Sequence, residues 1–283
     1  MKGLNKTLCA ALALGGAALP LNVHADDVRA NAADASAWSP DSKSQARMIA
    51  GSNNAGGSLR AGVEIKLQPG WHTYWRYPGD AGVPPRFDFA GSGNLKTVKV
   101  LYPAPHLFTD ESGSSIGYTD NVIFPLRVTP RDPDKPVTLK LKIDYAVCEK
   151  LCIPAEAKGE LTLAPGASAL EANLAAAEAR VPKQVSAGEA GLTARRVNNA
   201  AKPLVAVDLK AAAGKPVTVF VEGPTPEWAL PIPKPAQGAP AGHRQFGFEL
   251  DGLPPGVSPK GPFELTFTIV EGDEAREVKT HLD

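Results

Sequence analysis

The sequence predicts an all-β protein built from two β-sandwich domains joined by a short helix. The first observation is length, because 283 residues suit two domains of about 100–130 residues each. The second is composition, since 27 glycines and 27 prolines favour many short strands and turns over long helices. The third is the recurrence, in both halves, of short runs in which apolar and polar residues alternate.

Residues 1–25 have the features of a secretory signal peptide. Lys2 and Lys6 make the start basic, and an apolar run follows that is too short to cross a hydrocarbon layer of about 30 Å. Val23 and Ala25 then occupy the −3 and −1 positions of a cleavage site. We therefore expect an exported, periplasmic protein.

The signal region and the charge of the chain that follows it limit which anchors and partners we expect. We expect no lipid anchor, because Cys9 lies inside the apolar run and Lys6 stands where a lipoprotein signal needs an apolar residue. Residues 26–45 are polar and rich in alanine, which predicts a flexible lead-in. Without Lys2 and Lys6 the basic side chains number 30 − 2 = 28 against 30 acidic ones, a net charge of −2. This balance gives no electrostatic reason to expect binding to nucleic acid.

The first predicted sandwich domain covers residues 46–166. In the run WHTYWR at 71–76, alternation places Trp71 and Trp75 on one face and Tyr74 on the other. We expect these aromatic side chains to lie in the core or on a sandwich face rather than to contact a ligand. The strand-like runs of this domain are 59–67, 71–76, 95–102, 122–128, 137–147 and 159–164.

A helix is predicted between the two sandwiches, within a connector at 167–183. Ser168 and Glu171 have the spacing of a capping box, apolar residues follow at helical spacing, and a proline ends the run. The second sandwich is predicted at 190–283, which contains no cysteine and no evident catalytic cluster. Its strand-like runs are 192–197, 203–209, 216–222, 244–250, 263–270 and 276–282.

Two cysteines, Cys148 and Cys152, lie in the stretch DYAVCEKLCIPAE. If a strand continued through them, their Cα atoms would be about 13 Å apart, whereas a disulfide needs about 7 Å or less. A bond between them therefore requires a turn at 149–151, and the strand-like runs on both sides favour a hairpin there. A disulfide that closes so short a loop would stabilise the fold by only about 2 kcal/mol. A chain this long can bury a sufficient core without a disulfide. An accessible pair of this kind suits thiol–disulfide exchange. Export would also place the pair in a compartment where disulfides form.

These residues alone leave three roles open for the pair: a redox centre, a structural disulfide or a metal site. Zinc needs four ligands, and the histidines show no paired spacing. Met48 is the only methionine after Met1, which excludes a methionine-rich copper site but leaves a two-thiolate Cu(I) site open. We expect no resident metal and no cofactor. Lys150 in the turn would lower a thiol pKa if it lies close enough.

Three ordered motifs resemble the N-terminal periplasmic domain of DsbD/ScsB-type thiol:disulfide interchange proteins. They are WHTYWRYPGDAGVPP at 71–85, the pattern Tyr-Pro…Ile-Gly-Tyr-x-Asp…Phe-Pro-Leu within 102–126, and YAVCEKLCIP at 145–154. The resemblance covers residues 46–165 strongly, and the helix and second sandwich resemble the ScsB-like branch more loosely. It implies two immunoglobulin-like domains, with the cysteine pair in a hairpin near one end of the first.

The resemblance also implies an electron relay through Cys148 and Cys152. The pair would take electrons from a DsbD- or CcdA-like membrane transporter or a thioredoxin-like protein, and would reduce exported disulfide proteins. By analogy with the downstream cysteine of the family, Cys152 is the attacking residue. Because DsbD-type proteins continue into membrane and thioredoxin-like domains and this chain ends at Asp283, we expect a separate electron donor. The alternatives are a non-catalytic adaptor with a structural disulfide and a Cu(I)-handling thiol protein.

In DsbD a cap loop covers the cysteines, with acidic residues followed by aromatic ones. The corresponding stretch here lies near 106–115. Asp110 and Glu111 match its acidic part and would serve in capping or in proton transfer during exchange. Ser112 stands at the aromatic position, so Phe108 is the nearest substitute. The three residues between the cysteines fit the ScsB-like branch better than DsbD itself.

Overall fold

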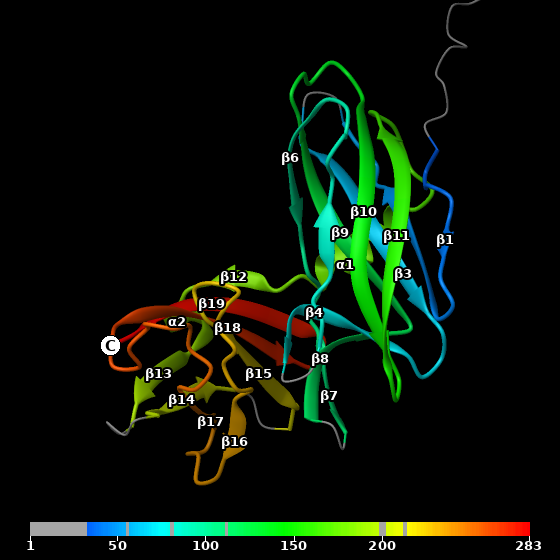
Figure 1. Cartoon of the computed structure of the whole chain (residues 1–283). Coiled ribbons are helices and arrows are strands. Elements are labelled where there is room, and N and C mark those ends of the chain that lie inside the picture. The colour runs from blue at the N-terminus through cyan, green and yellow to red at the C-terminus, as the bar shows by residue number, and fades with distance from the viewer. Residues whose placement is uncertain (1–32, 55–56, 80–81, 111–112, 198–201, 212–213) are drawn as a thin grey trace, which may run out of the picture. The chain divides into compact units, whose positions relative to one another are not determined.

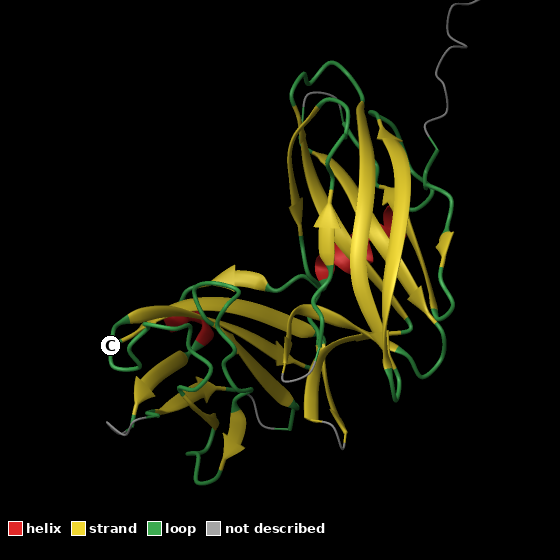
Figure 2. Cartoon of the chain, viewed as in Figure 1, coloured by secondary structure: helices red, strands yellow, loops and turns green. Residues whose placement is uncertain are grey.

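The computed structural model describes residues 33–54, 57–79, 82–110, 113–197, 202–211 and 214–283, and the predicted signal peptide lies outside them. Within these residues the chain is mostly β, with strands β1 to β19 and the two short helices α1 and α2 (Figures 1 and 2). None of the described helices has the length and apolarity needed to cross a membrane. The all-β prediction is confirmed at this level.

The first half of the chain forms two antiparallel sheets that share one core. One sheet has the order β1-β2-β3-β9-β6, and the other has the order β11-β10-β4-β8-β7 with β5 paired to β10. Val63 and Phe124 from the first sheet and Trp75 and Ile143 from the second all belong to one buried cluster. The strands are β1 (Ser39–Pro40), β2 (Ser44–Ala50), β3 (Leu59–Leu67), β4 (His72–Gly79), β5 (Arg86–Asp88), β6 (Leu95–Val100), β7 (His106–Asp110), β8 (Gly113–Thr119), β9 (Asn121–Pro130), β10 (Val137–Cys148) and β11 (Cys152–Leu163).

The described part of the predicted lead-in pairs with β2. Ser39 in β1 is the Cα partner of Ala46, and Ala35 forms an isolated bridge with Ile49. The backbone of Ser36 donates to the carbonyl of Met48, and the Ser36 hydroxyl accepts from the Met48 N–H. From residue 33 onward this segment is therefore held along the edge of the first sheet, where the sequence predicts a flexible stretch.

Strand β10 shows why this sequence forms a sandwich. Every second residue from Val137 to Tyr145 is buried, whereas the threonine, two lysines and one aspartate between them are partly or fully exposed. This alternation is the period-2 pattern of a strand with one face on a core. Near the end of the strand both faces become buried, because Ala146 and Cys148 pack with Tyr74 on the side away from the main core. The cysteine pair therefore begins at a point where β10 is covered on both faces.

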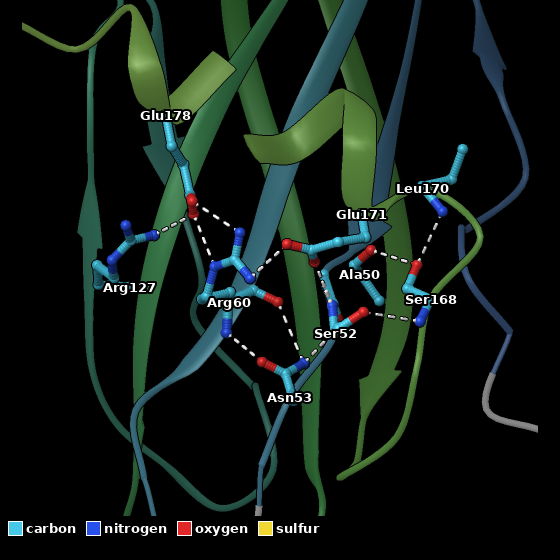
Figure 3. Close-up of polar contacts among 10 residues, drawn as sticks. Ala50, Ser52, Asn53, Arg60, Arg127, Ser168, Leu170, Glu171 and Glu178 are labelled. Carbon is cyan, nitrogen blue, oxygen red and sulfur yellow. Dashed lines mark hydrogen bonds and ion pairs between the residues drawn. The ribbon is translucent and has the colours of Figure 1, made fainter. Parts of the chain in front are cut away.

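Helix α1 (Glu171–Ala179) does not have the predicted capping box. Its N-cap is Leu170, with no side-chain cap. The Ser168 hydroxyl instead donates to the carbonyl of Ala50 and accepts from the N–H of Leu170 (Figure 3). Ser168 and Glu171 have the spacing of a capping box, but the side chain of Glu171 instead accepts from the backbone of Ser52 and from Arg60 in β3.

Glu171 and Glu178 fasten α1 to the first sheet through arginines. Arg60 in β3 donates to Glu171 at 2.7 Å and binds both oxygens of Glu178, which also accepts from Arg127 (Figure 3). The backbone N–H of Ser52 and the guanidinium of Arg60 lower the pKa of Glu171. Burial opposes ionisation of Glu178, but the hydrogen bonds from Arg60 and Arg127 outweigh it and lower its pKa. The helix is thus part of the first sandwich rather than a free connector.

Leu174 is the apolar contact beneath this ion-pair network. It is fully buried and clusters with Ile49 and Ile123. Glycines make the space for it, since a Cβ built on Gly51 would lie 2.6 Å from a methyl of Leu174 and one on Gly62 would lie 3.1 Å from the other. Leu174 of α1 therefore packs at two positions where any residue larger than glycine would crowd it.

The second half of the chain repeats the plan of two sheets around one core. The sheets have the orders β12-β19-β18-β15 and β13-β14-β17-β16, and β12 runs parallel to β19. Val207 and Phe246 from one sheet share a buried cluster with Val219 and Phe267 from the other. The elements are β12 (Lys183–Val185), α2 (Ala187–Ala190), β13 (Leu192–Arg196), β14 (Leu204–Lys210), β15 (Val217–Glu222), β16 (Lys234–Ala236), β17 (His243–Glu249), β18 (Phe263–Glu271) and β19 (Glu274–Leu282).

Candidate functional site

Cys148 and Cys152 form a disulfide that closes the hairpin between β10 and β11. They are direct Cα partners at the end of the ladder, with Cα atoms 4.1 Å apart. The three residues between them make the turn. The hairpin turn that the sequence predicts is thus confirmed, and the bond joins two positions that the strands already place face to face.

The two cysteines differ in accessibility. Cys148 is 8% exposed and packs with Tyr74 and Ala146, whereas Cys152 is exposed. Leu151 in the turn is 72% exposed, so the tip of the hairpin projects into solvent. An incoming thiolate therefore reaches Cys152 more readily than Cys148.

Tyr74 on β4 supplies a polar contact to the disulfide. Its hydroxyl lies 3.0 Å from the Sγ atom of Cys152, and because a disulfide sulfur carries no proton, the hydroxyl donates. The ring is 1% exposed. The neighbouring Thr73 hydroxyl donates to the carbonyl of Ala146 at 2.8 Å, which ties β4 to β10 beside the pair. In the reduced pair a donor in this position would favour a thiolate at Cys152 over a thiol.

Aromatic rings continue from Tyr74 to the hairpin formed by β7 and β8. His72, the Cα partner of Cys148, meets Tyr74 edge to face at 5.3 Å between ring centroids. His72 also contacts Phe108 on β7, with the two rings stacked at 5.0 Å and nearly parallel. The structure therefore brings Phe108 into the layer of rings beside the cysteines.

Of the acidic part of the predicted cap loop, Asp110 lies in the same hairpin. Asp110 ends β7, and its backbone pairs with Gly113 at the start of β8. Glu111 lies outside the described residues. The role of Asp110 and Glu111 in capping or proton transfer stays a prediction.

The comparisons with known proteins agree with this geometry. Residues 42–164 match the family model of the thiol:disulfide interchange protein DsbD, N-terminal. This segment is therefore similar to a DsbD N-terminal domain. The resemblance that the three sequence motifs indicate is thereby confirmed.

A solved structure extends the likeness beyond the DsbD N-terminal domain. The crystal structure of the N-terminal periplasmic domain of ScsB from Proteus mirabilis matches with a TM-score of 0.70 and 21% identity, covering 88% of this chain and 98% of that chain. At this level of identity the match shows a shared fold that includes most of the second half. A search of curated protein sequences finds no match.

Two glycines allow other parts of the chain to approach β4 closely at Thr73 and Tyr74. Gly117 on β8 is the Cα partner of Tyr74, and a Cβ there would lie 1.9 Å from the carbonyl oxygen of Thr73. A Cβ on Gly82 would lie 2.6 Å from the ring of Tyr74. The backbone of β8 therefore lies close to the main chain at Thr73 and Tyr74, and the backbone at Gly82 lies close to the Tyr74 ring.

Sequence reasoning found the cysteines but missed His72 and Tyr74. Tyr74 is buried, as expected, yet it also contacts the sulfur. The available signal was its position on the strand face opposite Trp71 and Trp75, which both join the main core. Among the described residues no group of three or more histidine, cysteine or acidic side chains is arranged to hold a metal ion.

Proposed function

We propose that this chain is an exported thiol–disulfide interchange protein that relays electrons through Cys148 and Cys152. A DsbD- or CcdA-like membrane transporter, or a thioredoxin-like protein, supplies two electrons, and an exported disulfide protein receives them. The observation that carries the proposal is the disulfide at an exposed hairpin tip, with Cys152 accessible and hydrogen-bonded to Tyr74. The DsbD N-terminal domain at 42–164 supports the same reaction class.

The reaction begins from the reduced pair. The Cys152 thiolate attacks the substrate disulfide, whose S–S bond breaks as a mixed disulfide forms, and the released substrate thiolate takes up a proton. Cys148 then loses its proton and attacks the Sγ atom of Cys152. The mixed disulfide breaks, the substrate leaves as a dithiol, and the internal disulfide returns. The donor afterwards restores both thiols by the reverse exchange, which adds two electrons and two protons.

The surroundings suit each cysteine to one of these steps. Tyr74 donates to the sulfur of Cys152, which favours the thiolate needed for attack. Cys148 is 8% exposed, so an outside partner has little access to it before a mixed disulfide forms at Cys152. Cys148 is then the resolving residue, because the hairpin holds it beside the sulfur it must attack.

The location and the domain plan are part of this proposal. The predicted signal peptide at 1–25 supports export to the periplasm. The two pairs of sheets support two immunoglobulin-like sandwiches, a redox domain at 46–166 and a second domain at 190–283.

Trapping of partners tests the relay. Cys148→Ser leaves the attacking thiol without its resolving partner, so mixed disulfides should accumulate in periplasmic extracts and disappear on reduction. Cys152→Ser should capture far less, and the double variant serves as the control that captures nothing. If neither single variant captures a protein, the relay is wrong.

The reduction potential separates a relay from a structural disulfide. A labile, exchanging pair should have a potential above about −300 mV, whereas a bond that only supports the fold should lie below it. Equilibration of the purified protein with glutathione or dithiothreitol buffers measures this value. A potential well below that limit would favour an adaptor with a structural disulfide.

A further inference from the structure

Strand β4 contacts the disulfide at one residue and the second half of the chain at the next three. Tyr74 donates to Cys152. The ring of Trp75 lies 5.7 Å from that of Phe220 on β15, and the hydroxyl of Tyr77 donates to the carbonyl of Leu230. Arg76, between them, forms ion pairs with two glutamates of the second half.

The same residues form a bulge in the pairing of β4 with β8. Tyr74 pairs with Gly117 and Gly79 pairs with Ser115, so five steps along β4 face two along β8. Extra residues of this kind leave the ladder and bend the strand. The residues that leave the ladder here include Trp75, Arg76 and Tyr77, which contact the second half. Side chains of the second half therefore hold the bulge in place.

Arg76 makes the strongest of these contacts. Its guanidinium binds both carboxylate oxygens of Glu222 on β15, at 2.9 and 2.7 Å, and also pairs with Glu277 on β19. The planar group stacks at 4.5 Å from the centroid of Trp75. Burial disfavours the charge, but Glu222 and Glu277 outweigh it, so the pKa of Arg76 stays above its ordinary value. A bidentate pair of this kind fixes the orientation of the guanidinium as well as its distance from the carboxylate.

We propose that Arg76 is a positioning residue through which the second half holds the Tyr74 hydroxyl on the sulfur of Cys152. One residue separates Tyr74 from Arg76, so a shift of the strand at Arg76 moves the backbone that carries Tyr74. Gly82 lies close to the Tyr74 ring and leaves it little room to turn toward that side. When the hydroxyl withdraws, the Cys152 thiolate loses a hydrogen bond and its thiol pKa rises.

This inference goes beyond the relay, because it concerns the reactivity of Cys152 toward any electrophile. It assigns the second half a function in the chemistry of the first. The other ionisable groups beside the pair are His72 on β4 and Glu149 and Lys150 in the turn, and none of them is substituted in any variant. The Tyr74→Phe background separates their effect on Cys152 from that of the Tyr74 hydroxyl.

The test measures alkylation of Cys152 by iodoacetamide as a function of pH, in the full exported chain carrying Cys148→Ser. Arg76→Gln should raise the midpoint of the profile by about one pH unit, which means about tenfold less thiolate below the midpoint. Glu222→Gln, a milder change made entirely in the second half, should shift the midpoint in the same direction. Arg76→Lys keeps the charge but not the bidentate pair, and should recover part of the shift.

Arg60→Gln is the matched control. Like Arg76, the Arg60 side chain is 27% exposed and pairs with two glutamates, but it fastens α1 to the opposite sheet (Figure 3). It should lower thermal stability comparably and leave the midpoint unchanged. In a Tyr74→Phe background, Arg76→Gln should add no further shift.

Two results would overturn the inference. One is an Arg76→Gln protein that loses stability but keeps the parent midpoint, as Arg60→Gln should. The other is a shift that persists at full size in the Tyr74→Phe background. The alkylation profile is independent of the relay, because iodoacetamide reacts with Cys152 without any protein partner. Failure to trap partners would therefore refute the relay but not the role proposed for Arg76.

Discussion

Replacing Tyr74 by phenylalanine removes one oxygen and tests how the fold sets the reactivity of Cys152. In the oxidised protein the hydroxyl donates to a disulfide sulfur, which is a weak acceptor, so its loss should cost the fold less than about 1 kcal/mol. In the reduced protein the acceptor is a thiolate, and a hydrogen bond to a charged group contributes about 1.5–3 kcal/mol. Since one pKa unit corresponds to about 1.4 kcal/mol, the thiol pKa of Cys152 should rise by about one to two units.

The assay is the pH profile of Cys152 alkylation in the Cys148→Ser background, compared with and without Tyr74→Phe. The reduction potential gives a second reading, because a less stable thiolate favours the disulfide. Where the thiolate is populated, the potential should fall by about 30 mV for each 1.4 kcal/mol lost. A midpoint within about 0.3 units of the parent, together with an unchanged potential, would show that the hydroxyl does not act on the thiolate. Urea unfolding checks that the fold is intact.

Three further outcomes are expected. Phe108→Ala should speed reduction of the disulfide by dithiothreitol about two- to fivefold by removing a ring from the layer beside the pair; an unchanged rate would argue against a capping role. Leu174→Ala should cost about 2–5 kcal/mol in urea unfolding while leaving Cys152 alkylation unaltered. Glu171 and Glu178 have lowered pKa values, so the stability they add is present above their ordinary pKa of about 4.5 and is lost as pH falls through the lowered values. Arg60→Gln should therefore lose less stability than the parent between about pH 5 and pH 3, and parallel losses would contradict this.

The hairpin was predictable because its causes are local. Alternating residues before Cys148 and after Cys152 define two strands, and the length of chain between the cysteines then requires a turn. The contact of Tyr74 with the sulfur was not predictable in this way. Alternation places Tyr74 on the face away from Trp75, but the sulfur that its hydroxyl meets belongs to Cys152 on another strand, 78 residues later in the sequence.

Helix α1 shows how a tertiary partner displaces a local one. Ser168 and Glu171 have the right spacing for a capping box, and nothing nearby in the sequence argues against it. In the folded chain Glu171 instead accepts from the backbone of Ser52 and from Arg60, both more than a hundred residues earlier. The Glu171 carboxylate thereby accepts two charge-assisted hydrogen bonds, whereas the capping box would give it one.

The register of the hairpin bears directly on what the disulfide is for. Cys148 and Cys152 are the last of a continuous series of Cα partners that runs back to Val137 and Leu163. The ladder therefore holds the two cysteines together whether or not their sulfurs are bonded. A bond that closes so short and already paired a loop removes little entropy from the unfolded chain, which makes it a poor stabiliser. For exchange the same arrangement is an advantage, because once Cys152 has formed a mixed disulfide the resolving thiol of Cys148 is already within reach and no backbone movement has to precede the second step.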